Sequence, residues 1–249
     1  MPLDGKTQTL NRRFANHSAT SVMEHALKNL GTVGLVSSFG AESVVLLHMA
    51  AVIDRKVPVL FIDTEMLFAE TLVYQQEVAE RLHLENVRVI RAPRTQVFEK
   101  DNENLLHLHD PDACCALRKT QPLQDALQGF DGWVTGRKRY QGGQRAALEF
   151  FEVERPADAM PRIKVNPLAH WDTADLQEYI AQNRLPRHPL VAQGFASIGC
   201  APCTSRVAQG EDPRAGRWRD TDKEECGIHF EDGKLVRTPR VNALGDRIS

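Results

Sequence analysis

The chain has 249 residues, of which 42% are hydrophobic, and a formal net charge of -2. This length accommodates one large domain or a domain with a substantial appendage, and the composition is typical of a globular protein. The slightly acidic balance disfavours nucleic acid as a partner and favours a small ligand.

The beginning of the chain, residues 1–6, lacks the apolar segment of a secretory signal. No run of the sequence approaches the roughly 18 apolar residues that a membrane-spanning helix needs. We therefore expect a cytoplasmic protein that does not enter a membrane. In a reducing compartment its five cysteines are better interpreted as metal ligands or reactive thiols than as structural disulfides.

Strands and helices alternate through the first two thirds of the sequence. A helix over 21–30, capped by Ser18 or Thr20, precedes an apolar strand over 33–39 and a nearly apolar helix over 42–53. Further elements are expected as strands at 57–63, 87–90, 132–136 and 163–166, and as helices at 66–82 and from Cys114 onward. This alternation predicts an α/β fold, with a parallel twisted sheet flanked by helices.

The last third of the sequence is less regular. Asp172 and Asp175 form a capping pattern for a helix that runs through Ile180, after which proline and glycine residues predict a loop-rich region. From residue 210 the composition is polar and charged. We therefore expect one α/β domain over 1–209 and an extended or mobile C-terminal tail over 210–249.

The first predicted strand leads into its helix through small residues. Ligands of open parallel sheets bind beyond the carboxyl ends of the strands, where backbone N–H groups at a helix start and serine hydroxyls can bind phosphate. The residues of this segment are Ser37, Ser38, Phe39, Gly40, Ala41, Glu42 and Ser43. Such a pattern is also typical of an ordinary turn.

Two other segments end at the same predicted edge of the sheet. Asp63 ends the second strand, where it would contact a ribose or base or cap the following helix. Lys138, Arg139 and Arg145 follow the fourth strand, and we interpret them as an anion clamp or as a solvated basic loop.

Four of the cysteines can form one metal centre. Adjacent cysteines in a strand would point to opposite faces, whereas in a helix they diverge by about 100°, so we expect Cys114 and Cys115 to open a helix. With Cys200 and Cys203 they supply four thiolates, which match a tetrahedral zinc or a cubane iron–sulfur cluster. Zinc sites usually combine two spaced Cys-x-x-Cys pairs, so the adjacent pair favours a cluster and leaves zinc as the alternative.

The fifth cysteine, Cys226, lies in a polar segment with cationic neighbours. These neighbours are Arg214, Arg217, Arg219 and His229. A thiol that meets cations is more ionised and more nucleophilic, although Glu224 and Glu225 act in the opposite direction. We interpret Cys226 as a nucleophile, with an incidental surface thiol as the alternative.

Five segments in order resemble the assimilatory sulfonucleotide reductases, specifically the thioredoxin-dependent adenylyl-sulfate reductases. They are residues 37–43, 62–68, 114–119, 199–204 and 225–229. The last three together are highly specific, and the resemblance runs from about residue 33 to 230. It implies an adenine nucleotide alpha hydrolase-like fold and reduction of adenylyl sulfate to sulfite and AMP, in sulfate assimilation and cysteine biosynthesis.

The resemblance also implies roles for individual residues. It implies a nucleotide loop from Ser37 to Ser43 and Cys226 as the nucleophile that forms an S-sulfocysteine, which thioredoxin then reduces. The four remaining cysteines would hold a [4Fe-4S] cluster on Cys114, Cys115, Cys200 and Cys203. The anionic phosphosulfate is assigned to Lys119, Arg214, Arg217 and His229. The loop departs from the wider superfamily at Gly40 and at Glu42–Ser43, and so does the segment after Asp63 at Glu65.

Three other functions remain open. The first is reduction of 3′-phosphoadenylyl sulfate, alone or together with adenylyl sulfate. A cluster-dependent enzyme that thiolates tRNA would need a basic surface, which the net charge of -2 disfavours. The third is a zinc-stabilised binding module without catalysis. A homo-oligomer is possible in each case.

Overall fold

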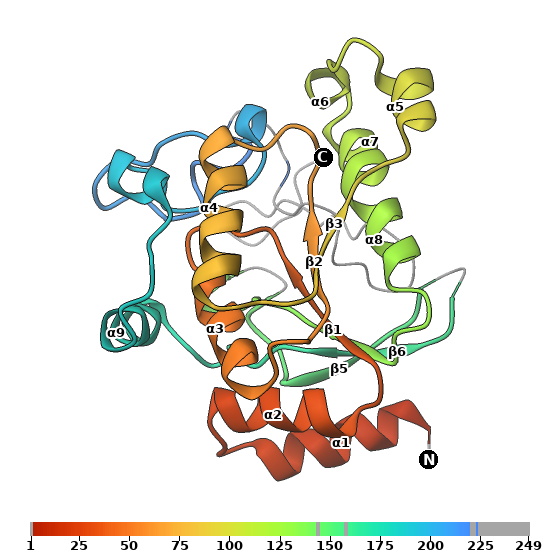
Figure 1. Cartoon of the computed structure of the whole chain (residues 1–249), viewed down its shortest axis with the longest axis vertical. Helices are drawn as coiled ribbons and strands as arrows, with labels where there is room; N and C mark the ends of the chain where they lie inside the picture. The colour runs from red at the N-terminus through yellow and green to blue at the C-terminus, as the bar shows by residue number, and fades with distance from the viewer. Residues whose placement is uncertain (1, 143–144, 157–158, 220–222, 224–249) are drawn as a thin grey trace, which may run out of the picture.

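The computed structural model in Figure 1 describes residues 2–142, 145–156, 159–219 and 223. A six-stranded sheet has the order β3-β2-β1-β4-β6-β5. Its strands are β1 Val33–Ser37, β2 Val59–Ile62, β3 Val87–Ile90, β4 Gly132–Val134, β5 Phe151–Glu154 and β6 Arg162–Val165. Strand β5 pairs antiparallel with β6, and the other four pairings are parallel. The predicted α/β fold is confirmed.

Helices cover both faces of this sheet (Figure 1). They are α1 Leu3–Phe14, α2 Ala19–Asn29, α3 Ser43–Ile53, α4 Ala69–Arg81, α5 Arg94–Asp101, α6 Leu106–His109, α7 Pro111–Cys115, α8 Gln121–Ala126 and α9 Thr173–Gln182. Helix α3 packs on β1, α2 and α9 in the main core. Helix α8 covers the opposite face over Leu60, Ile62 and Trp133. No helix among the described residues combines the length and apolar character needed to cross a membrane.

Local signals place several helices where the sequence predicts them. The Ser18 hydroxyl accepts from the Ser21 backbone N–H at 3.2 Å and caps α2. Asp172 and Asp175 form a reciprocal capping box at the start of α9. Helix α1 was not among the predicted elements. It packs on β5 and β6, so its stability depends on contacts with distant residues.

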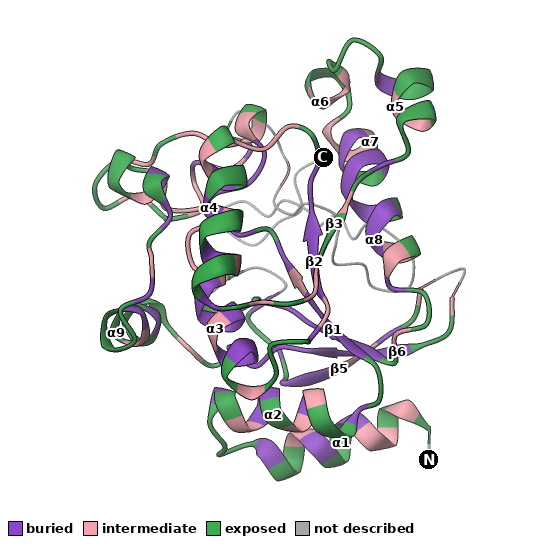
Figure 2. Cartoon of the chain, in the orientation of Figure 1, coloured by how far each residue is buried: buried purple, intermediate pink, exposed green. Residues whose placement is uncertain are grey.

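All five predicted strands are confirmed, and β5 is an additional one. Strands β1, β2, β4 and β6 are almost entirely buried, whereas β3, at the edge of the sheet, is partly exposed (Figure 2). Strand β5 buries Glu154 instead of a hydrophobic residue at its end. Its strand character therefore depends on partners for that carboxylate, which come from other strands.

The chain order fixes where a ligand can bind. After β1 the chain winds outward through β2 to β3, then returns across the sheet to β4 on the other side of β1. In open α/β sheets the crevice for ligands lies at such a reversal, beyond the carboxyl ends of the strands. The reversal here lies between β1 and β4, so the segments after these two strands are the expected walls of a site.

A charged cluster is buried between β4, β5 and β6. Glu154 accepts hydrogen bonds from Trp133 Nε1 at 2.9 Å and from Arg162 Nε at 2.6 Å. Lys164 Nζ lies 3.7 Å from Glu154 Oε1 and 4.8 Å from the centre of the Trp133 ring. Burial, assisted by the charge of Arg137, lowers the pKa of Lys164 to about 7, although Glu154 acts in the opposite direction.

This shift predicts a measurable pH dependence of stability. The pKa of Lys164 is lowered from 10.5, so above pH 7 the unfolded chain binds more protons than the folded one, and stability rises with pH until about 10.5. Between about pH 7.5 and about pH 9.5, the free energy of unfolding of the wild type should rise by about 2 kcal/mol more than that of Lys164→Met. Urea unfolding at both pH values measures this difference, and Lys100→Met at an exposed position is the control. Equal gains in the wild type and Lys164→Met would contradict the assignment.

Candidate active site

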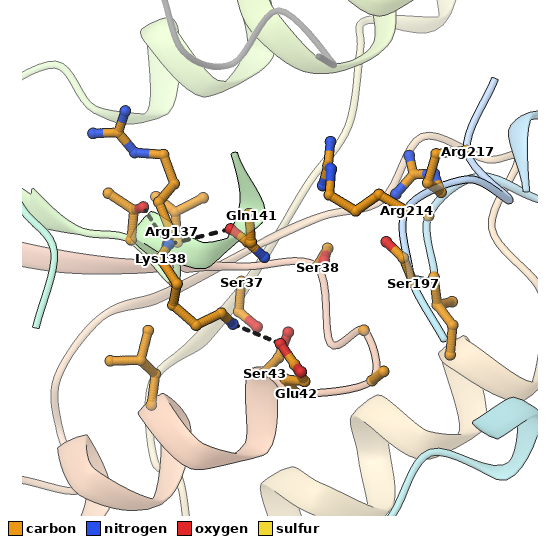
Figure 3. Close-up of a pocket in the computed structure, with 18 of the residues that line it drawn as sticks. Ser37, Ser38, Glu42, Ser43, Arg137, Lys138, Gln141, Ser197, Arg214 and Arg217 are labelled. Atoms are coloured by element: carbon orange, nitrogen blue, oxygen red, sulfur yellow. Dashed lines mark hydrogen bonds and ion pairs between the residues drawn. The ribbon is translucent and has the colours of Figure 1, made fainter. Parts of the chain in front are cut away.

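A cavity of about 260 Å³ lies at the carboxyl ends of β1 and β4. Figure 3 shows its walls, which include the loop from β1 to α3, the loop after β4 and the segment around Ser197 and Arg214. Eight of the substrate-binding residues predicted from the sequence line it. These are Ser37, Ser38, Gly40, Glu42, Ser43, Lys119, Arg214 and Arg217. The structure therefore brings together residues that are far apart in the sequence.

The loop from β1 to α3 is anchored by a buried aromatic side chain. Phe39 takes a positive φ of 48°, and its ring packs edge-on against Phe61 with 5.2 Å between the centroids. The Ser37 hydroxyl accepts from the Phe39 N–H at 3.1 Å. A Cβ on Gly40 would lie 3.0 Å from the carbonyl oxygen of Ile198. Phe39 therefore contributes to the loop through its backbone, while its side chain belongs to the core.

The basic loop after β4 contributes some of its predicted cations and not others. Lys138 and Arg145 line the cavity. Lys138 Nζ is 2.6 Å from Glu42 Oε2, and the Tyr140 hydroxyl donates to the same carboxylate. Arg139 instead donates from Nε to the carbonyl oxygen of Leu148 at 2.6 Å and does not line the cavity. Lys138 and Arg139 are adjacent in the sequence, but a turn of 3-10 helix over Arg139–Gln141 begins between them.

Asp63 is at the carboxyl end of β2, but its carboxylate is engaged by the protein. Its Oδ2 accepts from Arg91 Nε at 2.8 Å, and its Oδ1 accepts from the Glu65 N–H at 2.9 Å. The next residue, Thr64, lines the cavity instead. Sequence reasoning did not select Thr64, although its position directly after a buried strand was a signal for it.

The segment that holds Arg214 and Arg217 pairs with the Cys-x-x-Cys loop. The Ser205 N–H donates to the Gly216 carbonyl at 2.7 Å, and the Trp218 N–H donates to the Cys203 carbonyl at 3.2 Å. The Arg217 guanidinium stacks on the Trp218 ring at 4.4 Å. It also occupies the space beside Gly199, because a Cβ there would lie 2.3 Å from Arg217 Nη2. The start of the predicted tail thus contributes directly to the cavity.

Two predicted site residues, Cys226 and His229, lie outside the described residues. The proposed domain boundary at residue 210 and the mobility of the tail remain predictions. The described residue closest to them in sequence is Lys223. Its Nζ donates to the Pro111 carbonyl at 3.1 Å and pairs with the Asp112 carboxylate at the start of α7.

The other four cysteines line a second, smaller cavity next to the first. They are Cys114, Cys115, Cys200 and Cys203. Cys114 and Cys115 are helical, as predicted, but they end α7 instead of opening a helix. Helix α7 begins at Pro111 because Asp110 Oδ1 caps it by accepting from the Asp112 and Ala113 N–H groups. A π-helical turn over Ala116–Thr120 continues the chain into α8.

Cys200 is held on the other side of this cavity by the segment after β2. The Ala201 N–H donates to the Met66 carbonyl at 2.8 Å, and Leu67 forms an isolated β-bridge with Cys200. Thr64 Oγ1 lies 3.2 Å from Cys200 Sγ. Four thiols around one cavity are the donor set of a thiolate-bound metal centre. Among the described residues, no group of three or more histidine, cysteine, aspartate and glutamate side chains is arranged to hold a single metal ion.

The charges around the thiols differ from one cysteine to another. Burial, reinforced by Cys115, raises the pKa of Cys114 to about 12. Burial acts in the same direction on Cys200, but Lys119 and the Thr64 hydroxyl outweigh it, so the pKa of Cys200 is lowered. Cationic Lys119 therefore stabilises a thiolate at Cys200.

Three residues, Thr64, Lys119 and Cys200, line both cavities. They form the wall between the cavity at the ends of β1 and β4 and the cysteine cavity. A charge placed in one cavity therefore acts on the other across a single layer of side chains.

Comparison with known proteins identifies the family. Residues 32–206 match the model of the phosphoadenosine phosphosulfate reductase domain. The chain belongs to this family. It is 43% identical to the adenosine 5′-phosphosulfate reductase of Chelativorans sp. over 234 residues, which are 92% of this chain and 94% of that protein. The enzyme of the same name from Mesorhizobium japonicum is 43% identical over 227 residues, covering 90% of this chain and 87% of that protein.

Solved structures agree with this membership. The phosphoadenylyl-sulfate reductase of Candida auris, in a phosphate complex, superposes with a TM-score of 0.67 and 27% identity. The match covers 81% of this chain and 96% of that chain. The FMN adenylyltransferase of Candida glabrata superposes with a TM-score of 0.54 and 18% identity, over 78% of this chain and 66% of that chain, which shows a shared fold alone. The resemblance to sulfonucleotide reductases and the fold that it implies are confirmed.

A buried ion pair supports the cysteine cavity. Arg118 donates from Nε and Nη2 to Asp101 Oδ2 at 3.0 and 2.8 Å, and from Nη1 to the Thr64 carbonyl at 3.0 Å. The two charged side chains are 2% and 1% exposed. Arg118 thereby connects α5 to the segment after β2.

This pair predicts a large effect of Asp101→Asn on stability. The substitution leaves the Arg118 charge buried without its counterion, which costs about 3 kcal/mol and lowers the thermal midpoint by roughly 6–12 °C. Differential scanning calorimetry measures the midpoint. The control is Glu24→Gln, which breaks an exposed ion pair with Lys28 and should change stability by less than ~0.5 kcal/mol. Similar midpoints for both variants would contradict the structural role of Asp101.

Proposed function

We propose that this protein reduces adenylyl sulfate to sulfite and AMP as an oxidoreductase of sulfate assimilation. One observation carries the proposal: a cationic cavity at the β1–β4 reversal shares Lys119 and Cys200 with a cavity lined by four thiols. Two enzymes named for this reaction, each 43% identical to the chain and matching about nine tenths of it, support it.

The cavity suits an adenine nucleotide with an anionic end. The loop from Ser37 to Ser43 lines the cavity before α3 and offers serine hydroxyls and backbone N–H groups as hydrogen-bond partners for the nucleotide. Arg214, Arg217 and Lys119 supply positive charge to this cavity. Lys119 also lines the cysteine cavity, and the charge of Arg217 acts on Cys200. We infer that the phosphosulfate lies on this side, because charge-assisted hydrogen bonds to arginine are the strongest that a phosphate or sulfate can form.

Cys226 is the proposed nucleophile. Its thiolate attacks the sulfur of adenylyl sulfate, the bond between that sulfur and the phosphate oxygen breaks, and AMP leaves with both bonding electrons. The cations around the cavity stabilise the negative charge that develops on the departing phosphate. The product on the enzyme is an S-sulfocysteine.

The anchoring of Lys223 supports this role for Cys226. The Lys223 side chain is 7% exposed and bound to Pro111 and Asp112 at the start of α7, beside the cysteine cavity. Three residues of extended chain span at most about 11 Å, which limits how far Cys226 can lie from Lys223. Lys223 is therefore attached beside the cysteine cavity, whose lining includes Pro111.

A dithiol reductant completes the proposed cycle. One thiolate of thioredoxin attacks the Cys226 sulfur and expels sulfite, and the second thiol of thioredoxin resolves the mixed disulfide, which restores the Cys226 thiol. Thioredoxin supplies both electrons. Whether the chain also reduces 3′-phosphoadenylyl sulfate is decided by comparing kcat/KM for the two nucleotides.

The donor set fits a [4Fe-4S] cluster on the four cysteines of the second cavity, with Lys119 next to Cys200. When bound, such a cluster would contribute to the potential at the substrate sulfate without having to change its oxidation state. Lys119, which lines both cavities, would then supply positive charge to the cluster and to the phosphosulfate. The tandem cysteines on a helix and the Cys200 loop would then be fixed relative to each other.

The nucleophile assignment predicts a covalent enzyme species. Wild-type protein mixed with adenylyl sulfate in the absence of thioredoxin should gain one sulfonate group per chain, detected by intact-protein mass spectrometry. Cys226→Ser should gain none, because a serine hydroxyl is not ionised at neutral pH. The variant should still bind AMP, which shows that its cavity is intact. A sulfonated Cys226→Ser protein would rule out this nucleophile.

The cluster assignment predicts a different result for the other cysteines. Cys200→Ser, purified without oxygen, should lose most of its iron, sulfide and visible absorption, because a hydroxyl replaces one thiolate ligand. Cys226→Ser is the matched control and should retain them. Equimolar zinc without colour in the wild type would support a zinc-stabilised module and contradict the cluster.

A further inference from the structure

Glu42 places a carboxylate in a cavity that is otherwise strongly cationic. Of the described residues that line the cavity, six have cationic side chains, whereas only Glu42 and Asp212 have carboxylates. The cations are Lys119, Arg137, Lys138, Arg145, Arg214 and Arg217. In a site that binds anions, a carboxylate opposes the binding of an anionic group placed beside it.

The Glu42 carboxylate is not used to cap a helix. Glu42 precedes the first residue of α3, yet its side chain accepts no capping hydrogen bond from the helix. Instead it binds Lys138 Nζ at 2.6 Å and the Tyr140 hydroxyl at 3.0 Å. These partners fix the carboxylate from the β4 side of the cavity.

The Glu42 carboxylate is more accessible to a ligand than Lys138, with which it pairs. The Glu42 side chain is 29% exposed, whereas the Lys138 side chain behind it is 4% exposed. A carboxylate offers about four lone-pair positions, so Glu42 can accept another hydrogen bond while it keeps its two protein partners. A ligand that reaches this part of the cavity therefore contacts the negatively charged Glu42 carboxylate, while Lys138, which balances that charge, is buried.

The position of Glu42 assigns it to the nucleoside. In Figure 3, Glu42 and Lys138 lie across the cavity from Arg214 and Arg217, with Ser38 between the two pairs. Lys119 also lines the cysteine cavity and the charge of Arg217 acts on Cys200, so the proposed function places the phosphosulfate beside these two cations. The ribose and base then extend toward Glu42.

A carboxylate beside a ribose is a known physical discriminator. It accepts hydrogen bonds from free ribose hydroxyls and repels a phosphate on the same sugar, whereas a cation accommodates that phosphate. In this cavity a carboxylate and a cation lie together, because Glu42 pairs with Lys138 and screens its charge. Loss of the Glu42 charge would therefore remove the repulsion of a phosphate on the ribose. It would also leave the positive charge of Lys138 available to that phosphate.

We propose that Glu42 is the specificity-determining residue that selects a nucleotide with a free ribose 3′-hydroxyl over one with a 3′-phosphate. The inference rests on the proposed function for the orientation of the nucleotide. Glu42 accepts the ribose hydroxyl and holds Lys138 away from a 3′-phosphate. Tyr140 positions the carboxylate and does not itself discriminate.

Glu42→Gln tests the proposal, because glutamine keeps the size and the acceptor oxygen but loses the charge. The probes are AMP and adenosine 3′,5′-bisphosphate, and isothermal titration calorimetry measures their dissociation constants. Wild-type protein should prefer AMP. In Glu42→Gln the ratio of the two affinities should shift toward the bisphosphate by about tenfold, the effect of one removed like charge at contact distance. An unchanged ratio would overturn the proposal.

Asp212→Asn is the matched control, because it removes the same charge from the other carboxylate of the cavity. It should leave the ratio of affinities close to that of the wild type. If Asp212→Asn shifted the ratio as much as Glu42→Gln, the effect would be one of overall charge and the proposal would be wrong. Tyr140→Phe keeps both carboxylates and should also leave the preference for AMP. Thermal midpoints show whether each variant is folded.

The readout separates this proposal from the proposed function. If the wild type reduces adenylyl sulfate and Glu42→Gln leaves the affinity ratio unchanged, the selectivity role fails and the reaction stands. If the wild type shows no reduction, the proposed function fails, while the affinity ratio still tests how the cavity recognises the ribose.

Discussion

The contacts between the segment after β2 and the Cys200 loop fix the positions of the two cavities relative to each other. Thr64 contacts Cys200 through its hydroxyl and accepts from Arg118 through its carbonyl, and Met66 accepts from the Ala201 N–H. The tandem cysteines come from the helix before Arg118, so both halves of the thiol set are attached to one short turn. Without this turn, neither the wall shared by the cavities nor the position of Lys119 would be defined.

Buried charge is used in two different ways on the two sides of this turn. Arg118 is fully paired with Asp101, so its charge is structural. Lys119, its neighbour in the π-helical turn, faces Cys200 and both cavities. A π-helical turn widens the helix by one residue, which changes the angular spacing of adjacent side chains. Because adjacent side chains of a helical segment diverge widely, one cation faces the core and the next faces the site.

The sequence was sufficient for the fold and for eight of the residues that line the cavity, but not for the direction of each side chain. Strands such as β1 and β2 are apolar runs next to turns, a local pattern that predicts them directly. Strand β5 was missed because Glu154 is acceptable inside only with Trp133 and Arg162, which lie on other strands. Partners of this kind are set by sheet register, which no local pattern contains.

The same limit explains the differences within the site. Lys138 and Arg139 are adjacent basic residues of one loop, yet only Lys138 lines the cavity. Asp63 had the right position for a ligand contact, but Arg91 from the segment after the neighbouring strand binds its carboxylate. Residue type and strand end thus predict where a site forms. The competition among nearby charges, which depends on packing, decides which groups remain available to a ligand.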